Sequence, residues 1–312
     1  MRPQATRPLA IFACVVTVAL AACGTTAAPS SSPPSSSGPT PAHTGTPAPT
    51  PGGATPSPSA TAEAAVPLLR VTSEGGFINP ASTLAALPTV VVYTDGRIVT
   101  PGAAASIAPA PLVSPVDVRD VGPAGAAAIL AAIKQAGLDR PATGGPGIPG
   151  DSGTNVFTVI VNGATTTTRL AGGGPPGPGK PGGASGDPER TSALELLNRL
   201  LDPAETWGAA SAPETPLAAT AYRIFVAPGA PPSDTAAQPP VAWPLSTPLD
   251  GFGATAQPDR GISGLRVGVV SGTDATRLGP ILLSATTETP FTSNGKSYTL
   301  YVRPLLPDEL DG

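Results

Sequence analysis

The stretch Thr89-Val90-Val91-Val92-Tyr93, followed by Asp95-Gly96 and then Arg97-Ile98-Val99, decides the fold of this chain. β-Branched and aromatic residues favour strands, and Asp-Gly between two such runs is typical of a hairpin turn. The stretch therefore predicts two antiparallel strands joined by a tight turn. We interpret Asp95 as a turn residue, because Asp before Gly commonly has this structural role.

The pattern recurs twice along the chain. Asn162-Gly163 lies between the β-prone runs 155–161 and 165–170, and Asn294-Gly295 precedes the run 297–302. The two Asn-Gly pairs predict a second hairpin and a turn into the last strand. The patterning of apolar residues predicts further strands over 68–71, 222–226 and 265–270.

Two segments have clear helical periodicity. A helix predicted over 123–136 begins with proline and is followed by Gly137, and one over 187–201 is capped by Asp187, with Trp207 packing behind it. The apolar face of the first helix consists of Ala126, Ile129, Leu130 and Ile133. The expected buried side of the second consists of Leu194, Leu197, Leu200 and Leu201.

A third helix is predicted to start at a cap formed by Thr273 or Asp274 and to reach about residue 285. Pro280 lies within it, and we expect this residue to kink or divide the helix. Residues 243–245 and 249–252 are expected to supply apolar cover for the neighbouring strands.

These elements predict an α+β fold of antiparallel hairpins with a few packed helices. Their order suggests two small subdomains, 66–208 and 221–312, joined by a Pro/Ala/Thr-rich connector at 209–220. Segment 23–65 is almost entirely Ala, Pro, Ser, Thr and Gly. Because so little apolar surface cannot repay the entropy of ordering, this segment is predicted to be a disordered tether.

The N-terminus has the order of a secretory signal peptide. Arg2 and Arg7 precede an apolar run that ends at Leu20, and two small residues then lead into Cys23. The run is shorter than the roughly 20 residues of a membrane-spanning helix. The sequence therefore predicts that residues 1–22 are a cleaved signal peptide.

Leu20-Ala21-Ala22-Cys23 resembles the lipobox of bacterial lipoproteins. The resemblance implies cleavage between Ala22 and Cys23, a diacylglyceryl group with acyl chains such as palmitate on Cys23, and a place on the extracytoplasmic face of the cell membrane. Two acyl chains are sufficient for stable anchoring. An ordinary signal peptide with an unrelated cysteine is the alternative. Over 66–312 the order of elements is similar to that of uncharacterised actinobacterial secreted lipoproteins, and this likeness carries no catalytic residue across.

Composition excludes several kinds of chemistry. Both cysteines, Cys14 and Cys23, and the one histidine, His43, precede residue 66. The predicted body therefore has no disulfide, no Cys or His nucleophile, no Ser-His-Asp triad and no thiolate or imidazole zinc site. We expect no cofactor and no bound metal. The chain has 17 basic and 21 acidic residues, so it lacks the basic excess that nucleic acid selects, and we expect no nucleic-acid partner.

The candidate catalytic residues have structural explanations. Asp117 and Asp120 flank Arg119, which favours a surface ion pair over a catalytic carboxylate pair. The Gly/Pro loop 171–186 contains Lys180 in a partial match to a phosphate-binding P-loop, but the eighth position is proline where Ser or Thr is needed. We therefore assign no catalytic residue.

Two further groups allow a binding or a structural interpretation. Arg303, followed by Asp308 and Glu309, is either a recognition patch or, as we predict, a local ion-paired cap on the last strand. Four aromatic residues either line a sugar or peptide cleft or, as we predict, pack in the core. These are Trp207, Trp243, Tyr222 and Tyr298.

The sequence leaves two functions open. We predict a lipid-anchored binding or interaction module of the cell envelope, whose ligand is an envelope protein, a peptide or a glycan. The alternative is a carboxylate-dependent envelope hydrolase. Two buried carboxylates facing each other in a cleft would favour the hydrolase, whereas an apolar cleft or a flat patch would favour binding.

Overall fold

The computed structural model of the protein describes residues 66–75, 83–104, 108–140, 153–171, 188–208, 212–232, 238–256 and 262–310. The predicted signal peptide, Cys23, the tether and Lys180 lie outside these ranges. Among the described residues, no helix combines the length and the apolar character needed to cross a membrane.

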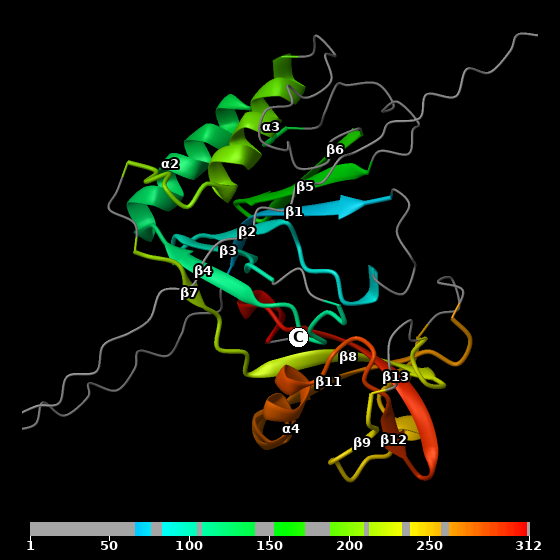
Figure 1. Ribbon diagram of the computed structural model, residues 1–312. Coiled ribbons are helices and arrows are strands. Elements are labelled where there is room, and N and C mark those ends of the chain that lie inside the picture. The colour runs from blue at the N-terminus through cyan, green and yellow to red at the C-terminus, as the bar shows by residue number, and fades with distance from the viewer. Residues whose placement is uncertain are drawn as a thin grey trace, which may run out of the picture. The chain divides into compact units, whose positions relative to one another are not determined.

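The fold is α+β, as the sequence predicts, and it contains two sheets (Figure 1). The strands of the first sheet are β1 (Pro67–Glu74), β2 (Val90–Tyr93), β3 (Arg97–Pro101), β4 (Val116–Asp120), β5 (Thr154–Val161), β6 (Ala164–Ala171) and β7 (Thr215–Pro216). They pair antiparallel in the order β6-β5-β1-β2-β3-β4-β7.

The strands of the second sheet are β8 (Ala221–Pro228), β9 (Val241–Ala242), β10 (Ala254–Thr255), β11 (Arg266–Ser271), β12 (Phe291–Ser293) and β13 (Lys296–Pro304). Their order is β10-β11-β8-β13-β12-β9, and β12 and β9 pair in parallel while the others pair antiparallel. The helices are α2 (Gly122–Gln135), α3 (Pro188–Leu201), α4 (Gly272–Ser284), and the 3₁₀ helices η1 (Leu249–Gly251) and η3 (Pro307–Glu309).

The hairpin of β2 and β3 is confirmed, with a three-residue connection. Val91 faces Val99 and Val92 faces Ile98, which leaves residues 94–96 as the turn. Gly96 has φ 98°, as the glycine of a three-residue hairpin loop requires, and a Cβ there would lie 2.2 Å from the carbonyl oxygen of Gly122. Asp95 accepts a hydrogen bond from the backbone N–H of Arg97 at 3.0 Å, so its turn role is confirmed.

The two Asn-Gly pairs form two-residue turns. Asn162 and Gly163 have φ 50° and 77°, and Asn294 and Gly295 have φ 51° and 70°. Positive φ at both central residues is characteristic of the type I′ turn, whose twist matches that of the flanking strands. Both predictions from the Asn-Gly pattern are confirmed.

Helices α2 and α3 lie side by side over one face of the first sheet (Figure 1). The carboxyl end of α2 has Gly137 at φ 73°, and the N–H of Leu138 reaches back to the carbonyl of Ile133, as in a Schellman cap. The predicted buried side of α3 is confirmed for Leu197 and Leu200 and wrong for Leu194 and Leu201. Leu194 and Leu201 are half-buried, because the stripe that follows the helical period consists of Ala193, Leu196, Leu197 and Leu200.

Helix α4 covers the second sheet, with Leu278 and Leu282 fully buried. Its N-cap is Ser271, so the predicted cap at Thr273 or Asp274 is wrong. Pro280 lies inside one continuous helix rather than dividing it. It is on the exposed side of the helix, where its ring does not displace core side chains.

A short segment from each half of the chain packs beside the sheet of the other half. Residues 110–112 pair with 285–287 beside the second sheet, with hydrogen bonds of 2.9 and 3.0 Å, and Leu112 is part of the second core. Conversely, Leu306 from the C-terminal half packs against Val91 and Tyr93 of the first sheet. The division into subdomains at 209–220 therefore stays a prediction.

Candidate functional site

The four aromatic residues are core residues, as predicted. Trp207, Tyr222, Tyr298 and Trp243 are at most 9% exposed. Trp243 packs edge-to-face against Phe252 and Phe291, at ring-centroid distances of 5.8 and 6.5 Å. This confirms the apolar cover expected from 243–245 and 249–252.

Arg119 does not form the predicted surface ion pair. Its side chain is buried, and its guanidinium donates to the carbonyl oxygens of Leu200, at 3.0 Å, and Asp202. These carbonyls lie at the carboxyl end of α3, where the helix leaves acceptors unsatisfied and favours a cation. Asp120 instead accepts a hydrogen bond from the N–H of Gly122 at 2.8 Å.

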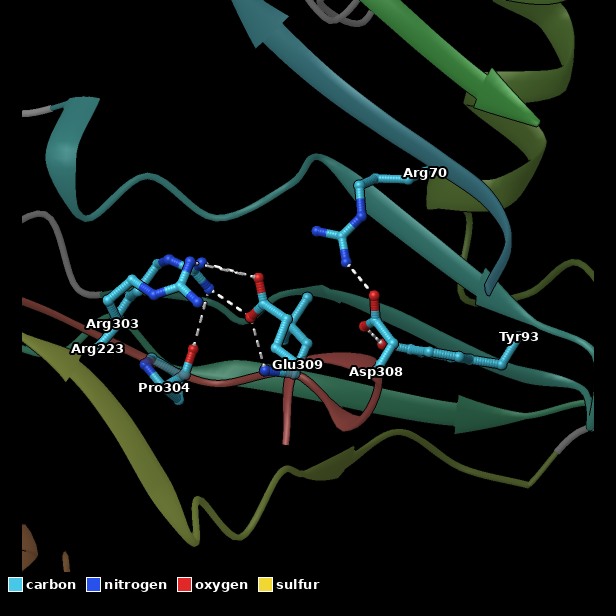
Figure 2. A network of polar contacts seen from close by, with 8 residues as sticks. Arg70, Tyr93, Arg223, Arg303, Pro304, Asp308 and Glu309 are labelled. Atoms are coloured by element: carbon cyan, nitrogen blue, oxygen red, sulfur yellow. Dashed lines mark hydrogen bonds and ion pairs between the residues drawn. The ribbon is translucent and has the colours of Figure 1, made fainter. Parts of the chain in front are cut away.

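Arg303 and Glu309 form the ion-paired cap that the sequence predicts (Figure 2). Two arginine nitrogens donate to the two carboxylate oxygens at 2.6 and 2.8 Å, the bidentate geometry of a strong pair. The N–H of Leu306 donates to the same carboxylate at 3.0 Å, and Arg223 approaches it at 4.0 Å. Both partners of the main pair are almost buried, with side chains 10% and 14% exposed.

Asp308 is not part of this local cap, so the prediction was wrong for that residue. Its carboxylate accepts hydrogen bonds from Arg70 of β1, at 2.5 Å, and from the hydroxyl of Tyr93 of β2, at 2.7 Å (Figure 2). The sequence did not identify these partners. The one available signal was a charge inside the apolar run 68–71, since a half-buried arginine needs a counter-charge.

We call the five residues Arg70, Tyr93, Arg303, Asp308 and Glu309 the C-terminal clamp. Burial alone raises the pKa of Glu309, but the hydrogen bonds from Arg303 and Leu306 and the charges of Arg303 and Arg70 outweigh it, so the pKa lies below its ordinary value. Burial, followed by the hydrogen bond to Asp308, raises the pKa of Tyr93. Each carboxylate therefore binds its own arginine, which is the arrangement of structural ion pairs.

A cleft of about 520 Å³ lies where residues 110–112 pass β13, and we call it the Tyr301 cleft. Its lining is mostly apolar and includes Ala86, Leu87, Pro111, Leu112, Pro232 and Tyr301. Clefts of 300 to 1,000 Å³ with few polar groups are typical of ligand sites.

The walls of this cleft are fixed by hydrogen bonds. The N–H of Thr287 donates to the carbonyl of Ala110 at 2.9 Å, and the Thr299 hydroxyl donates to the carbonyl of Gly229 at 3.0 Å. Tyr301 is half-buried, and burial raises its pKa, so its hydroxyl is neutral at pH 7 and can both donate and accept. The cleft is therefore a largely apolar surface with a few hydroxyl groups and one carboxylate, that of Glu288.

Within the described part of the chain, no group of three or more acidic, histidine or cysteine side chains is placed to hold a metal ion. Comparison with known proteins finds no matching family model, no similar curated protein and no similar solved structure.

Proposed function

We propose that this protein is a lipoprotein of the cell envelope, anchored through acyl chains on Cys23 at the extracytoplasmic face of the membrane. We further propose that its body is a binding module and that the Tyr301 cleft takes an apolar peptide segment of an envelope protein. The observation that carries the proposal is the cleft, about 520 Å³ in volume and mostly apolar in lining.

The chemistry of the lining favours a peptide over a glycan. A glycan has a hydroxyl group on most carbon atoms, and each buried hydroxyl needs a hydrogen-bond partner. The polar side chains of the lining are the hydroxyls of Ser114, Thr287, Thr299 and Tyr301 and the carboxylate of Glu288, and the other lining residues are apolar. An apolar peptide segment buries side chains that need no such partner, and only its backbone N–H and C=O groups require the polar groups of the lining, so the cleft suits it better.

The hydrolase alternative has less support. It requires a carboxyl group that can take up and release a proton beside its substrate. Among the described residues, the lining of the Tyr301 cleft contains a single carboxylate, Glu288, rather than a facing pair. Asp308 and Glu309 are each hydrogen-bonded to an arginine in the C-terminal clamp. Their geometry gives them a structural task instead.

The test compares two tryptophan substitutions at exposed alanines. Ala86→Trp places a large side chain in the Tyr301 cleft, whereas Ala131→Trp adds the same side chain to the exposed surface of α2. Fluorescence anisotropy would measure binding of a panel of labelled Leu-, Val- and Pro-rich decapeptides, and of a panel of peptidoglycan glycan fragments. We expect the peptides to bind. Ala86→Trp should lower their affinity at least about tenfold, or about 1.4 kcal/mol, and Ala131→Trp should leave their affinity unchanged. Binding of glycans alone, or equal peptide affinity in both variants, would contradict the proposal.

A further inference from the structure

A second cavity, of about 380 Å³, lies at one end of the second sheet, and we call it the Arg266 pocket. Its floor contains Val226, Leu249 and Tyr298, all at most 4% exposed. Its charged lining residues are Arg266, Lys296 and Asp250. The pocket therefore combines an apolar floor with a rim that has one excess positive charge.

The guanidinium of Arg266 is held in place by backbone carbonyls. Its Nε donates to the carbonyl of Phe252 and its Nη2 to that of Gly253, both at 2.8 Å. Gly253 has φ 56°, and a Cβ there would lie 2.1 Å from the carbonyl oxygen of Val267, so this close approach depends on glycine. The two bonds occupy one edge of the guanidinium and leave Nη1 and one hydrogen of Nη2 for another acceptor.

Lys296 has only a weak attachment in the pocket. Its Nζ lies 3.4 Å from an oxygen of Asp250, and the two side chains are 66% and 40% exposed. An exposed pair of this kind contributes little to stability and rearranges readily. Lys296 can therefore turn toward an anion that binds beside Arg266.

We infer that the Arg266 pocket binds a small apolar carboxylate, either a free acid or the C-terminal carboxylate of a peptide. The open edge of Arg266 matches the two oxygens of a carboxylate, and Lys296 adds a second charge. The apolar floor accommodates the attached side chain, which inorganic phosphate lacks. This site is separate from the Tyr301 cleft and does not depend on the proposed function.

The inference is tested by NMR titration of the isotope-labelled full chain, following the signals of Leu249 and Tyr298. The probes are N-acetyl-leucine, its uncharged amide, a tripeptide ending in leucine, and inorganic phosphate. We expect the first to bind, the amide and phosphate to bind at least about tenfold more weakly, and high salt to weaken binding by screening. The tripeptide distinguishes the sources, because a pocket for peptide termini binds it at least as well as the free acid.

Three variants change the charges in opposite directions. Arg266→Gln should lower the affinity for N-acetyl-leucine about tenfold or more, and Lys296→Gln should lower it about threefold. Asp250→Asn should raise this affinity about threefold, because it removes the competing carboxylate. Arg169→Gln removes an exposed arginine of β6 and should change nothing. If Arg266→Gln fails to fold, the opposite effects expected of Lys296→Gln and Asp250→Asn still test the inference. Equal binding of acid and amide, no binding at millimolar concentration, or Lys296→Gln and Asp250→Asn both without effect would overturn the inference.

Discussion

The hydroxyl of Tyr93 donates a hydrogen bond to the carboxylate of Asp308 at 2.7 Å, although the two residues are 215 positions apart in the sequence. Asp308 also binds Arg70 of the neighbouring strand, and the next residue, Glu309, binds Arg303 (Figure 2). Adjacent acids on η3 thus attach the end of the chain to the first sheet on one side and to the last strand on the other. The C-terminal clamp holds the segment that contains Leu306, and the side chain of Leu306 packs on the first sheet.

The clamp should contribute measurably to stability. Asp308→Asn removes the charge that Arg70 and Tyr93 share, in a place where the acid side chain is only 13% exposed. We expect a loss of about 2 kcal/mol in the free energy of unfolding, since hydrogen bonds to charged groups contribute about 1.5–3 kcal/mol. Chemical denaturation measures it, and a double-mutant cycle with Tyr93→Phe should give a coupling of about 1 kcal/mol.

Glu74→Gln is the matched control, because it removes the acid of the exposed ion pair with Arg169. The side chain of Glu74 is 50% exposed and that of Arg169 is 61% exposed. The substitution should cost less than about 0.5 kcal/mol. Equal losses for Asp308→Asn and Glu74→Gln would show that the clamp contributes no more than a surface pair.

The lowered pKa of Glu309 predicts how stability depends on pH. Because its pKa in the folded protein is below the ordinary value of 4.5, the ionised carboxylate stabilises the folded state fully above about pH 4.5. This contribution is lost as pH falls through the folded-state pKa. Urea denaturation between pH 7 and pH 3 should therefore show a decline that is reduced in Glu309→Gln. The variant should also be less stable by about 3 kcal/mol at pH 7, because it leaves Arg303 buried without its partner. A pH dependence equal to that of the wild type would refute this role for Glu309.

Arg119 should stabilise the protein through its hydrogen bonds to the carboxyl end of α3 rather than through ion pairs with its acidic neighbours. Arg119→Met keeps much of the buried volume but leaves the carbonyls of Leu200 and Asp202 without their donor, so we expect a loss of about 2–3 kcal/mol. Asp117→Asn should change the free energy of unfolding by less than about 0.5 kcal/mol. The reverse order in thermal or chemical denaturation would restore the ion-pair interpretation.

Membrane attachment should depend on Cys23. Cys23→Ala removes the thiol that would carry the diacylglyceryl group, so the variant should take up no acyl label and should accumulate as precursor or appear as released protein. Metabolic acyl labelling, membrane fractionation and intact mass measure the three outcomes. Label on the variant, or a wild-type N-terminus other than acylated Cys23, would show that the lipobox interpretation is wrong.

The sequence by itself determined the local structure. Asp95-Gly96, Asn162-Gly163 and Asn294-Gly295 predicted their turns, because the backbone at these positions needs positive φ and few residues adopt it. The helical period likewise located α2 and its glycine cap. Such signals lie within a few residues of the structure they specify, so they can be read from one sequence.

Only the tertiary structure decided which distant residues meet. Arg119 reads as a surface residue among acids, but the position of α3 makes it a buried donor to backbone carbonyls. Asp308 reads as part of a local cap, but the approach of β1 and β2 gives it Arg70 and Tyr93. The Tyr301 cleft likewise exists because residues 110–112 pair with 285–287. Side-chain partners depend on how elements pack in space, and no short-range pattern in the sequence encodes that choice.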